Sequence, residues 1–105
     1  MNKKYELFFG RVKKYDWSTD DNKKEICAIK VAVCDRDSGK ILTKRVVVKG
    51  KQLEQCCGLE LGLGIFVEGQ SQIKFIKNKI GESCSMEEVT AWAVGVTQIF
   101  SEVKI

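Results

Sequence analysis

"KRVVVKGKQLEQ", residues 44–55, joins three consecutive valines to a Lys-Gly-Lys step and then to a polar run that suits a helix. Consecutive β-branched residues favour a strand, and the glycine ends it. The stretch therefore predicts a buried strand followed directly by a short helix. Four basic residues border the valines: Lys44, Arg45, Lys49 and Lys51. They are either the solvated ends of an ordinary strand or a surface that meets a negatively charged partner.

Five segments have the composition of β-strands, separated by turns and by one plausible helix. The strands are expected at Tyr5–Tyr15, Glu25–Cys34, Ile41–Val48, Gly64–Lys77 and Glu88 to about Phe100, and the helix at 50–62. This order predicts an all-β fold: a five-stranded OB-fold Greek-key barrel with one short helix between strands 3 and 4. Bends are expected at Gly10, Gly50 and Gly69.

Alternation along the strands predicts which side chains face the core. In the second strand every other residue from Cys27 to Val33 is expected on one face, and Ala28, Lys30 and Ala32 on the other. In the fifth strand, Val89, Ala91 and Ala93 are expected on one face, opposite Thr90, Trp92, Val94 and Val96. Trp92 is expected in the core because its strand is apolar. The expected core or oligomer contacts are Phe8, Phe9, Phe66 and Phe100.

Length and hydropathy indicate one domain made in the cytoplasm. The 105 residues suffice for one core, so we expect a single domain over 1–105 with no C-terminal tail. No apolar run approaches the ~20 residues of a membrane span. The apolar stretch near the N-terminus, residues 7–9, is too short for a secretion signal. These features predict a cytoplasmic protein with no membrane partner.

The cysteines and the absence of histidine limit the chemistry that the chain can perform. Five cysteines without a secretion signal favour reduced thiols that pack as small apolar residues over a disulfide framework. No Cys-x-x-Cys spacing is present, so neither a metal nor another cofactor is predicted. Ser–His and Cys–His nucleophile pairs are excluded, and "GLELGLG", residues 58–64, lacks the Gly-Lys-Ser/Thr of a phosphate-binding loop. We therefore predict no enzymatic activity.

The charges are unevenly distributed along the chain. Residues 1–79 contain 17 Lys and Arg against 10 Asp and Glu, a net +7, whereas residues 80–105 contain 1 Lys against 4 Glu, a net −3. This asymmetry favours one basic face, which would attract nucleic acid or an acidic protein. The alternative is a charged surface with nothing bound.

Five motifs, taken in order, resemble the bacterial single-stranded DNA-binding protein family. They are "FFGRVKK" (8–14), "AIKVAVCDRD" (28–37), "RVVVKGKQLEQC" (45–56), "GLGIFVEGQSQIK" (62–74) and "VTAWAVGVTQIF" (89–100). The resemblance implies an OB-fold that binds single-stranded DNA without sequence preference. It also implies a homodimer formed through the first strand, where "ELFFG" is apolar on both faces.

The chain departs from that family where its members stack bases on aromatic rings. Lys49 precedes Gly50 in place of an aromatic residue, and the third strand begins with Leu42 and Thr43 in place of a tryptophan. Phe75 is the one ring left near the end of the fourth strand. The chain also stops at Ile105, without the family's linker and acidic tip. In this it resembles truncated relatives such as primosomal replication protein B.

Binding a single strand requires cations for the phosphates and rings for the bases. The candidate phosphate contacts are Arg11, Lys13, Lys30, Thr43, Arg45, Lys49, Lys74, Lys77 and Lys79, and the candidate rings are Tyr15, Trp17 and Phe75. By the resemblance, the outer face of the third strand is the binding face. For each lysine the alternative is a solvated surface, and for Tyr15 it is half-buried packing. With few rings, we expect weaker binding than in a standard family member, with steep salt dependence.

Two functions remain open at this point. The first is sequence-nonspecific binding of single-stranded DNA, or of RNA, in DNA replication or recombination, including that of a plasmid, phage or other mobile element. The second is an interaction module whose basic face binds a replication partner such as a helicase, primase or polymerase, with weak or no DNA binding. A gel shift with an oligo-dT of ~35 nucleotides separates them.

Overall fold

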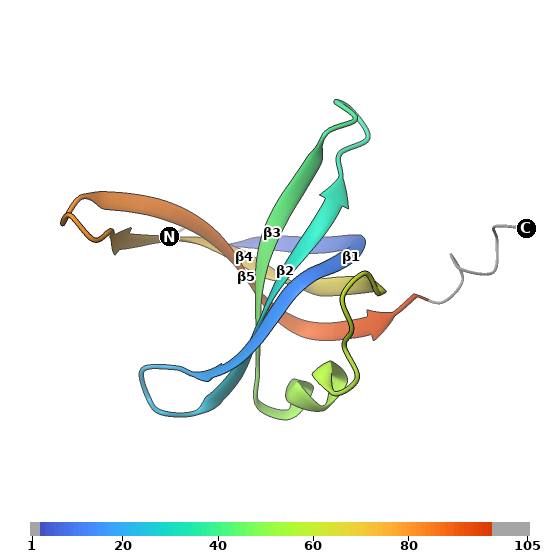
Figure 1. The fold of residues 1–105 in the computed structure, drawn as a ribbon, viewed down its shortest axis with the longest axis horizontal. Coiled ribbons are helices and arrows are strands. Elements are labelled where there is room, and N and C mark those ends of the chain that lie inside the picture. The colour runs from blue at the N-terminus through green and yellow to red at the C-terminus, as the bar shows by residue number, and fades with distance from the viewer. Residues whose placement is uncertain (1–2, 98–105) are drawn as a thin grey trace, which may run out of the picture.

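Five strands form a closed barrel in the order β1-β2-β3-β5-β4 in the computed structural model, which describes residues 3–97 (Figure 1). The elements are β1 Lys4–Thr19, β2 Glu25–Cys34, β3 Ile41–Lys49, the 3₁₀ helix η1 Gly50–Cys56, β4 Gly64–Lys77 and β5 Ser83–Val96. Neighbouring strands are antiparallel except β3 and β5, which are parallel. The predicted five-stranded OB-fold barrel is confirmed.

The barrel interior is filled by the inward side chains that the alternation predicted. Ile29 and Val31 on β2 and Val46 and Val48 on β3 are all fully buried. Cys27 and Cys56 are buried thiols, and all five cysteines are free. Small apolar and β-branched side chains therefore fill a narrow barrel, and the remaining side chains of these strands face outward.

The helix is shorter than the predicted span of 50–62. It ends at Cys56, and the next residues turn towards β4, with Gly58 at a φ of +109° that suits glycine. No helix within residues 3–97 is long and apolar enough to cross a membrane.

Hairpins extend beyond the barrel as separate arms, among them one formed by β2 and β3 and one formed by β4 and β5 (Figure 1). The second, the β4–β5 arm, comprises residues 73–87. Its pairing continues to Lys77 opposite Ser83, so β5 begins five residues earlier than the predicted Glu88. Asn78 closes the turn, because its Oδ1 accepts the backbone N–H groups of Ile80 at 3.1 Å and Glu82 at 2.9 Å. The predicted end of this strand at Phe100 lies outside the described residues.

A β-bulge changes the alternation of β5 at Trp92. The register shifts between Glu68 and Gly69, so Trp92 has no direct partner on β4. A Cβ on Gly69 would lie 2.2 Å from the carbonyl oxygen of Thr90, so only glycine allows this approach. Trp92 is 44% exposed and Val94 is buried. The expectation that Trp92 lies in the core is therefore wrong.

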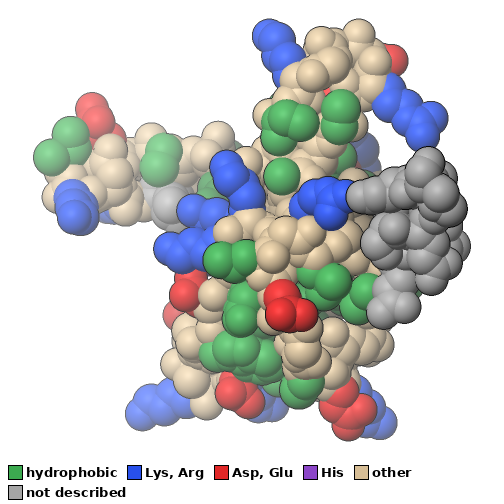
Figure 2. Space-filling view, turned by 45° about the vertical axis from the view of Figure 1, so that its right-hand side comes forward, with side chains coloured by type: hydrophobic (Ala, Val, Ile, Leu, Met, Phe, Trp, Pro, Cys, Tyr) green, Lys and Arg blue, Asp and Glu red, His purple; other side chains and the backbone are tan. Residues whose placement is uncertain are grey.

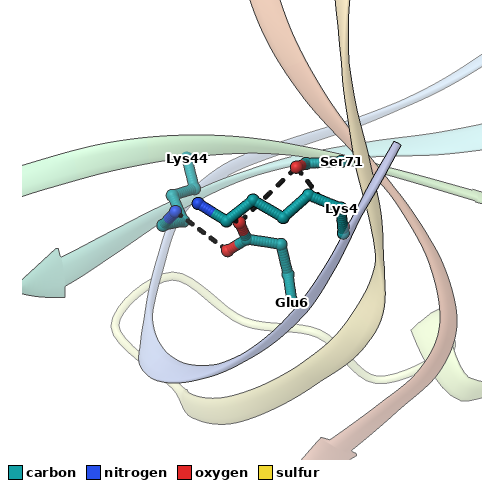
Figure 3. Close-up of polar contacts among 4 residues, drawn as sticks. All are labelled: Lys4, Glu6, Lys44 and Ser71. Atoms are coloured by element: carbon teal, nitrogen blue, oxygen red, sulfur yellow. Dashed lines mark hydrogen bonds and ion pairs between the residues drawn. The ribbon is translucent and has the colours of Figure 1, made fainter. Parts of the chain in front are cut away.

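A polar cluster lies at one end of the barrel (Figure 3). The Glu6 side chain is 11% exposed, accepts a hydrogen bond from Lys44 Nζ at 3.2 Å, and lies 3.9 Å from Lys4 Nζ. Ser71 Oγ lies 3.5 Å from both the Glu6 carboxylate and the Lys4 carbonyl oxygen. The Lys44 ammonium also lies 5.2 Å from the centre of the Phe8 ring. Lys44, one of the four basic residues around the valines, thus contacts Glu6 and Phe8 at the end of the barrel and does not lie on the outer face.

Candidate functional site

The outward faces of three adjacent strands carry basic side chains in register. Lys14 on β1 is opposite Lys30 on β2, and Lys30 is opposite Arg45 on β3. Directly paired residues share a face, and neighbouring strands are ~4.8 Å apart. We call Lys14, Lys30 and Arg45 the cationic row. It crosses the barrel on the face opposite the core residues Ile29 and Val31 of β2 and Val46 and Val48 of β3.

A bulge in β1 decides which lysine joins this row. The register shifts between Val12 and Lys14, so Lys14 takes the place opposite Lys30. Lys13, the residue predicted from simple alternation, lies exposed within the shift. Sequence reasoning missed Lys14, and because both residues are lysines the pattern gave no signal that could have found it.

Arg11 and Thr43 lie on the same outer face, one step along the strands from the cationic row. Both are opposite Ala32 on β2. The Arg11 guanidinium donates a hydrogen bond to the carbonyl oxygen of Gly62 at 3.0 Å, which holds it beside the chain that leads into β4. On β3, Thr43, Arg45 and Lys49 are separated by even numbers of residues and lie on one face, as alternation predicts.

Glu88 of β5 brings together two of the predicted site residues. Its carboxylate accepts Arg45 Nε at 3.0 Å and Lys74 Nζ at 2.8 Å, and its side chain is 6% exposed. Burial opposes ionisation, but the hydrogen bonds and charges of Lys74 and Arg45 outweigh it, so the pKa of Glu88 lies below its usual 4.5. Glu88 is thus ionised at neutral pH. Sequence reasoning did not single it out.

These residues line a groove of about 260 Å³ between the β1–β2 loop and the base of the β4–β5 arm. Its lining residues are Asp20, Asp21, Asn22, Ile26, Arg45, Val47, Lys49, Lys74 and Glu88. Three of them are cations and three are carboxylates. Figure 2 shows this mixture, with basic side chains gathered where the β4–β5 arm meets the barrel and acidic ones beside them.

Asp20 gives the β1–β2 loop its shape at the rim of this groove. Its Oδ1 accepts the backbone N–H groups of Asn22 and Lys24, each at 2.9 Å. The bond from Lys24 is the main reason that the pKa of Asp20 lies below its usual value, followed by the smaller contributions of Asn22 and the Lys49 charge. The loop therefore presents an ionised carboxylate towards Lys49.

The β4–β5 arm does not bring its predicted residues together. Lys74 and Phe75 are consecutive in a strand, so they lie on opposite faces of the arm. Lys74 reaches Glu88, whereas Phe75 is 78% exposed on the other side. Lys77 shares the side of Phe75 by alternation, and Lys79 lies in the turn. Phe75, Lys77 and Lys79 are therefore separate from the groove.

The other two predicted rings also lie away from the groove. Tyr15 is opposite the buried Ile29 and packs, half-buried, against the core. Trp17 is opposite Cys27 and lies over a shallow apolar patch beside η1 that includes Leu53. None of the residues that line the groove is aromatic.

Apart from Trp17 and Phe75, the aromatic rings exposed on the described chain gather on the outer face of β1, β4 and β5. Tyr5 and Trp92 have ring centres 6.0 Å apart, and Phe9 and Phe66 have centres 6.4 Å apart. Tyr5, Phe9 and Trp92 are 56%, 53% and 44% exposed. We call these four residues the aromatic face. The sequence analysis did not predict the aromatic face, because it placed Trp92 in the core and so left β5 without an exposed ring beside Tyr5.

Comparison with solved structures identifies the architecture. The chain is similar to the mitochondrial single-stranded DNA-binding protein Rim1 of S. cerevisiae, with a TM-score of 0.69 and 11% identity over 91% of this chain and 96% of that one. It is also similar to a small single-stranded DNA-binding protein of Streptomyces coelicolor, with a TM-score of 0.68 and 18% identity over 95% and 99%. No protein-family model and no curated protein matches the sequence. The resemblance predicted from the motifs is thus confirmed at the level of the fold.

Proposed function

We propose that the chain binds single-stranded DNA without sequence preference, along the outer face of β2 and β3. The observation that carries this proposal is the cationic row, three basic side chains in register across three strands. The similarity in fold to two proteins named for single-stranded DNA binding also supports this proposal. Because every nucleotide carries a phosphate, such a row binds the backbone whatever the bases are.

The ion pairs that the cationic row already makes determine how strongly it can bind phosphates. Lys14 lies 4.0 Å from Asp16, but both side chains are more than 60% exposed, so that pair is weak in water. Lys30 has no ion pair among the described residues. Within the cationic row, these two lysines are the more available to phosphates, whereas Arg45 is already bonded to Glu88. With no ring in the groove, the affinity depends mainly on phosphate contacts and falls as salt is added.

A titration with labelled oligo-dT of ~35 nucleotides tests the proposal. Fluorescence anisotropy at 50 and 200 mM salt is expected to show binding that weakens steeply with salt. Affinity that is indifferent to salt contradicts it. The proposed contacts are to phosphates, which RNA shares, so an oligo-U of equal length is expected to bind as well.

The second candidate function is an interaction module that binds a replication partner such as a helicase, primase or polymerase. The mixture of three carboxylates with three cations in the groove favours it, because carboxylates repel phosphates and pair with basic side chains of a protein. No gel shift with the oligo-dT at low salt would select this function. Under either function, we propose that the chain assists DNA replication or recombination in the cytoplasm.

We further propose that the chain forms a homodimer through β1. Between Lys4 and Gly10, β1 pairs with β4 on one side, and its pairing with β2 on the other side starts only at Arg11. Within the described residues, the second edge of this segment has no strand partner. An unpaired edge is a template for a second strand, and two copies meeting there close a two-fold dimer. Sedimentation velocity over a range of protein concentrations is expected to show a dimer.

A further inference from the structure

Glu88 is an anion buried in the floor of the groove that adjoins the proposed DNA-binding face, and Arg45 belongs to both. The Glu88 side chain is 6% exposed, and its two oxygens contact different cations, Arg45 at 3.0 Å and Lys74 at 2.8 Å. Two oxygens that bridge an Arg and a Lys are also what a phosphate group presents through its non-bridging oxygens. We propose that Glu88 occupies, in the free protein, the position of a phosphate between Arg45 and Lys74, and so lowers the affinity for the strand. This inference rests on the proposed function.

The exposure of the two cations shows that the contact can be exchanged. The side chains of Arg45 and Lys74 are 37% and 45% exposed, although the carboxylate that they hold is buried. Their remaining N–H donors are therefore available to the groove, and an incoming phosphate can bind them without unpacking the core. Either the phosphate displaces Glu88, or it binds with the carboxylate still beside it. In both cases the carboxylate opposes binding.

The neighbouring residue supplies a matched comparison. Glu87 is the preceding residue of β5, so it lies on the opposite face of the strand, and it is exposed. Replacing either glutamate by glutamine removes one negative charge, but only Glu88→Gln removes it from between the two cations. Removing one opposing charge from beside a bound phosphate in a partly hydrated site corresponds to about 3- to 10-fold in affinity.

The experiment compares wild type, Glu88→Gln and Glu87→Gln by anisotropy with oligo-dT of ~35 nucleotides at 50 and 200 mM salt. Glu88→Gln is expected to bind about 3- to 10-fold more tightly at 50 mM, with a steeper dependence on salt, whereas Glu87→Gln changes affinity less than about twofold. If wild type binds and Glu88→Gln binds equally or more weakly, the inference is overturned and the proposed function stands.

The other outcomes separate the two claims further. Binding by Glu88→Gln but not by wild type would refute the proposed function and support the inference. Absence of binding by all three proteins at low salt would refute both. Equal gains in Glu88→Gln and Glu87→Gln would show a general charge effect, and this also overturns the inference.

A second measurement on the wild type covers the case in which Glu88→Gln does not fold, which thermal melting would reveal. The Arg45 Nε–Hε signal in an NMR spectrum, assigned by its loss in Arg45→Lys, reports directly on the contact with Glu88. Addition of a short oligo-dT is expected to shift it, because the N–H changes its partner or gains a phosphate beside it. A signal that stays in place while signals of Lys30 and its neighbours shift would show that the strand does not reach Glu88.

Discussion

Removing two lysines of the cationic row measures directly how far binding depends on it. Lys14 and Lys30 are adjacent in register and are the members of the row without a buried carboxylate partner. Each phosphate contact on a single strand contributes about 0.7 to the slope of log affinity against log salt concentration. Lys14→Gln with Lys30→Gln therefore lowers the slope by about 1.4. When salt rises from 50 to 200 mM, the fold-loss of affinity in the double variant is therefore expected to be about sevenfold smaller than the fold-loss in wild type.

The assay is anisotropy with labelled oligo-dT at four or more salt concentrations, so that the slope is fitted rather than taken from two points. Lys51→Gln with Arg36→Gln is the matched control, since both residues are exposed and lie outside the row and the groove. It removes the same charge and is expected to leave the slope nearly unchanged. An unchanged slope in the row variant, or the same decrease in the control, would refute the placement of the strand across β1, β2 and β3.

Three further changes test the structure around this surface. Gly69→Ala is expected to destabilise the fold by about 1–3 kcal/mol in a denaturant melt, because its Cβ would meet the Thr90 carbonyl oxygen at 2.2 Å; unchanged stability would contradict the bulge. The pKa of Glu88 is lowered in the folded state, so its contribution to stability is present above about pH 4.5 and is lost as the pH falls through the folded value. Melting temperatures from pH 6 to pH 3 should consequently fall less in Glu88→Gln than in wild type, and equal falls would argue against an ionised Glu88. Trp17→Ala is expected to change oligo-dT affinity less than about twofold, since Trp17 lies beside η1 rather than in the groove; a loss of the ~1–3 kcal/mol typical of a stacked base would contradict this position.

The barrel could be predicted from the sequence because its strands are rich in apolar and β-branched residues and are separated by clear turns. β2 matches its predicted bounds, since every second residue is apolar and the turn that follows contains Asp, Ser and Gly. Alternation failed in β1 after Val12, where a bulge reverses the faces of the residues that follow. In β5 the bulge buries Val94, whereas Trp92 is exposed because it alternates with the buried Ala91, so reading the whole strand as core was the error there.

The site was predicted less completely, because contacts between strands that are distant in sequence determine its charge. Arg45 and Glu88 are 43 residues apart, and only the parallel pairing of β3 with β5 places them side by side. Counting charges along the chain indicates a basic surface, but it does not reveal which cations a carboxylate already holds. The prediction that Tyr15 and Trp17 line the site failed for a similar reason, because the pairing of β1 with β2 determines where their side chains point.

The pairing that closes the barrel also sets the order in which the chain can assemble. The β1–β2, β2–β3 and β4–β5 hairpins join neighbouring segments, but closure pairs Lys4 with Ser71 and Arg45 with Glu88. Each closure confines a long loop before any contact compensates for the lost chain entropy. We therefore expect the β1–β4 and β3–β5 pairings to limit the folding rate, which should lie in the slow range of β-proteins with many non-local contacts. The hairpins are expected to form first, and the enclosed interior last.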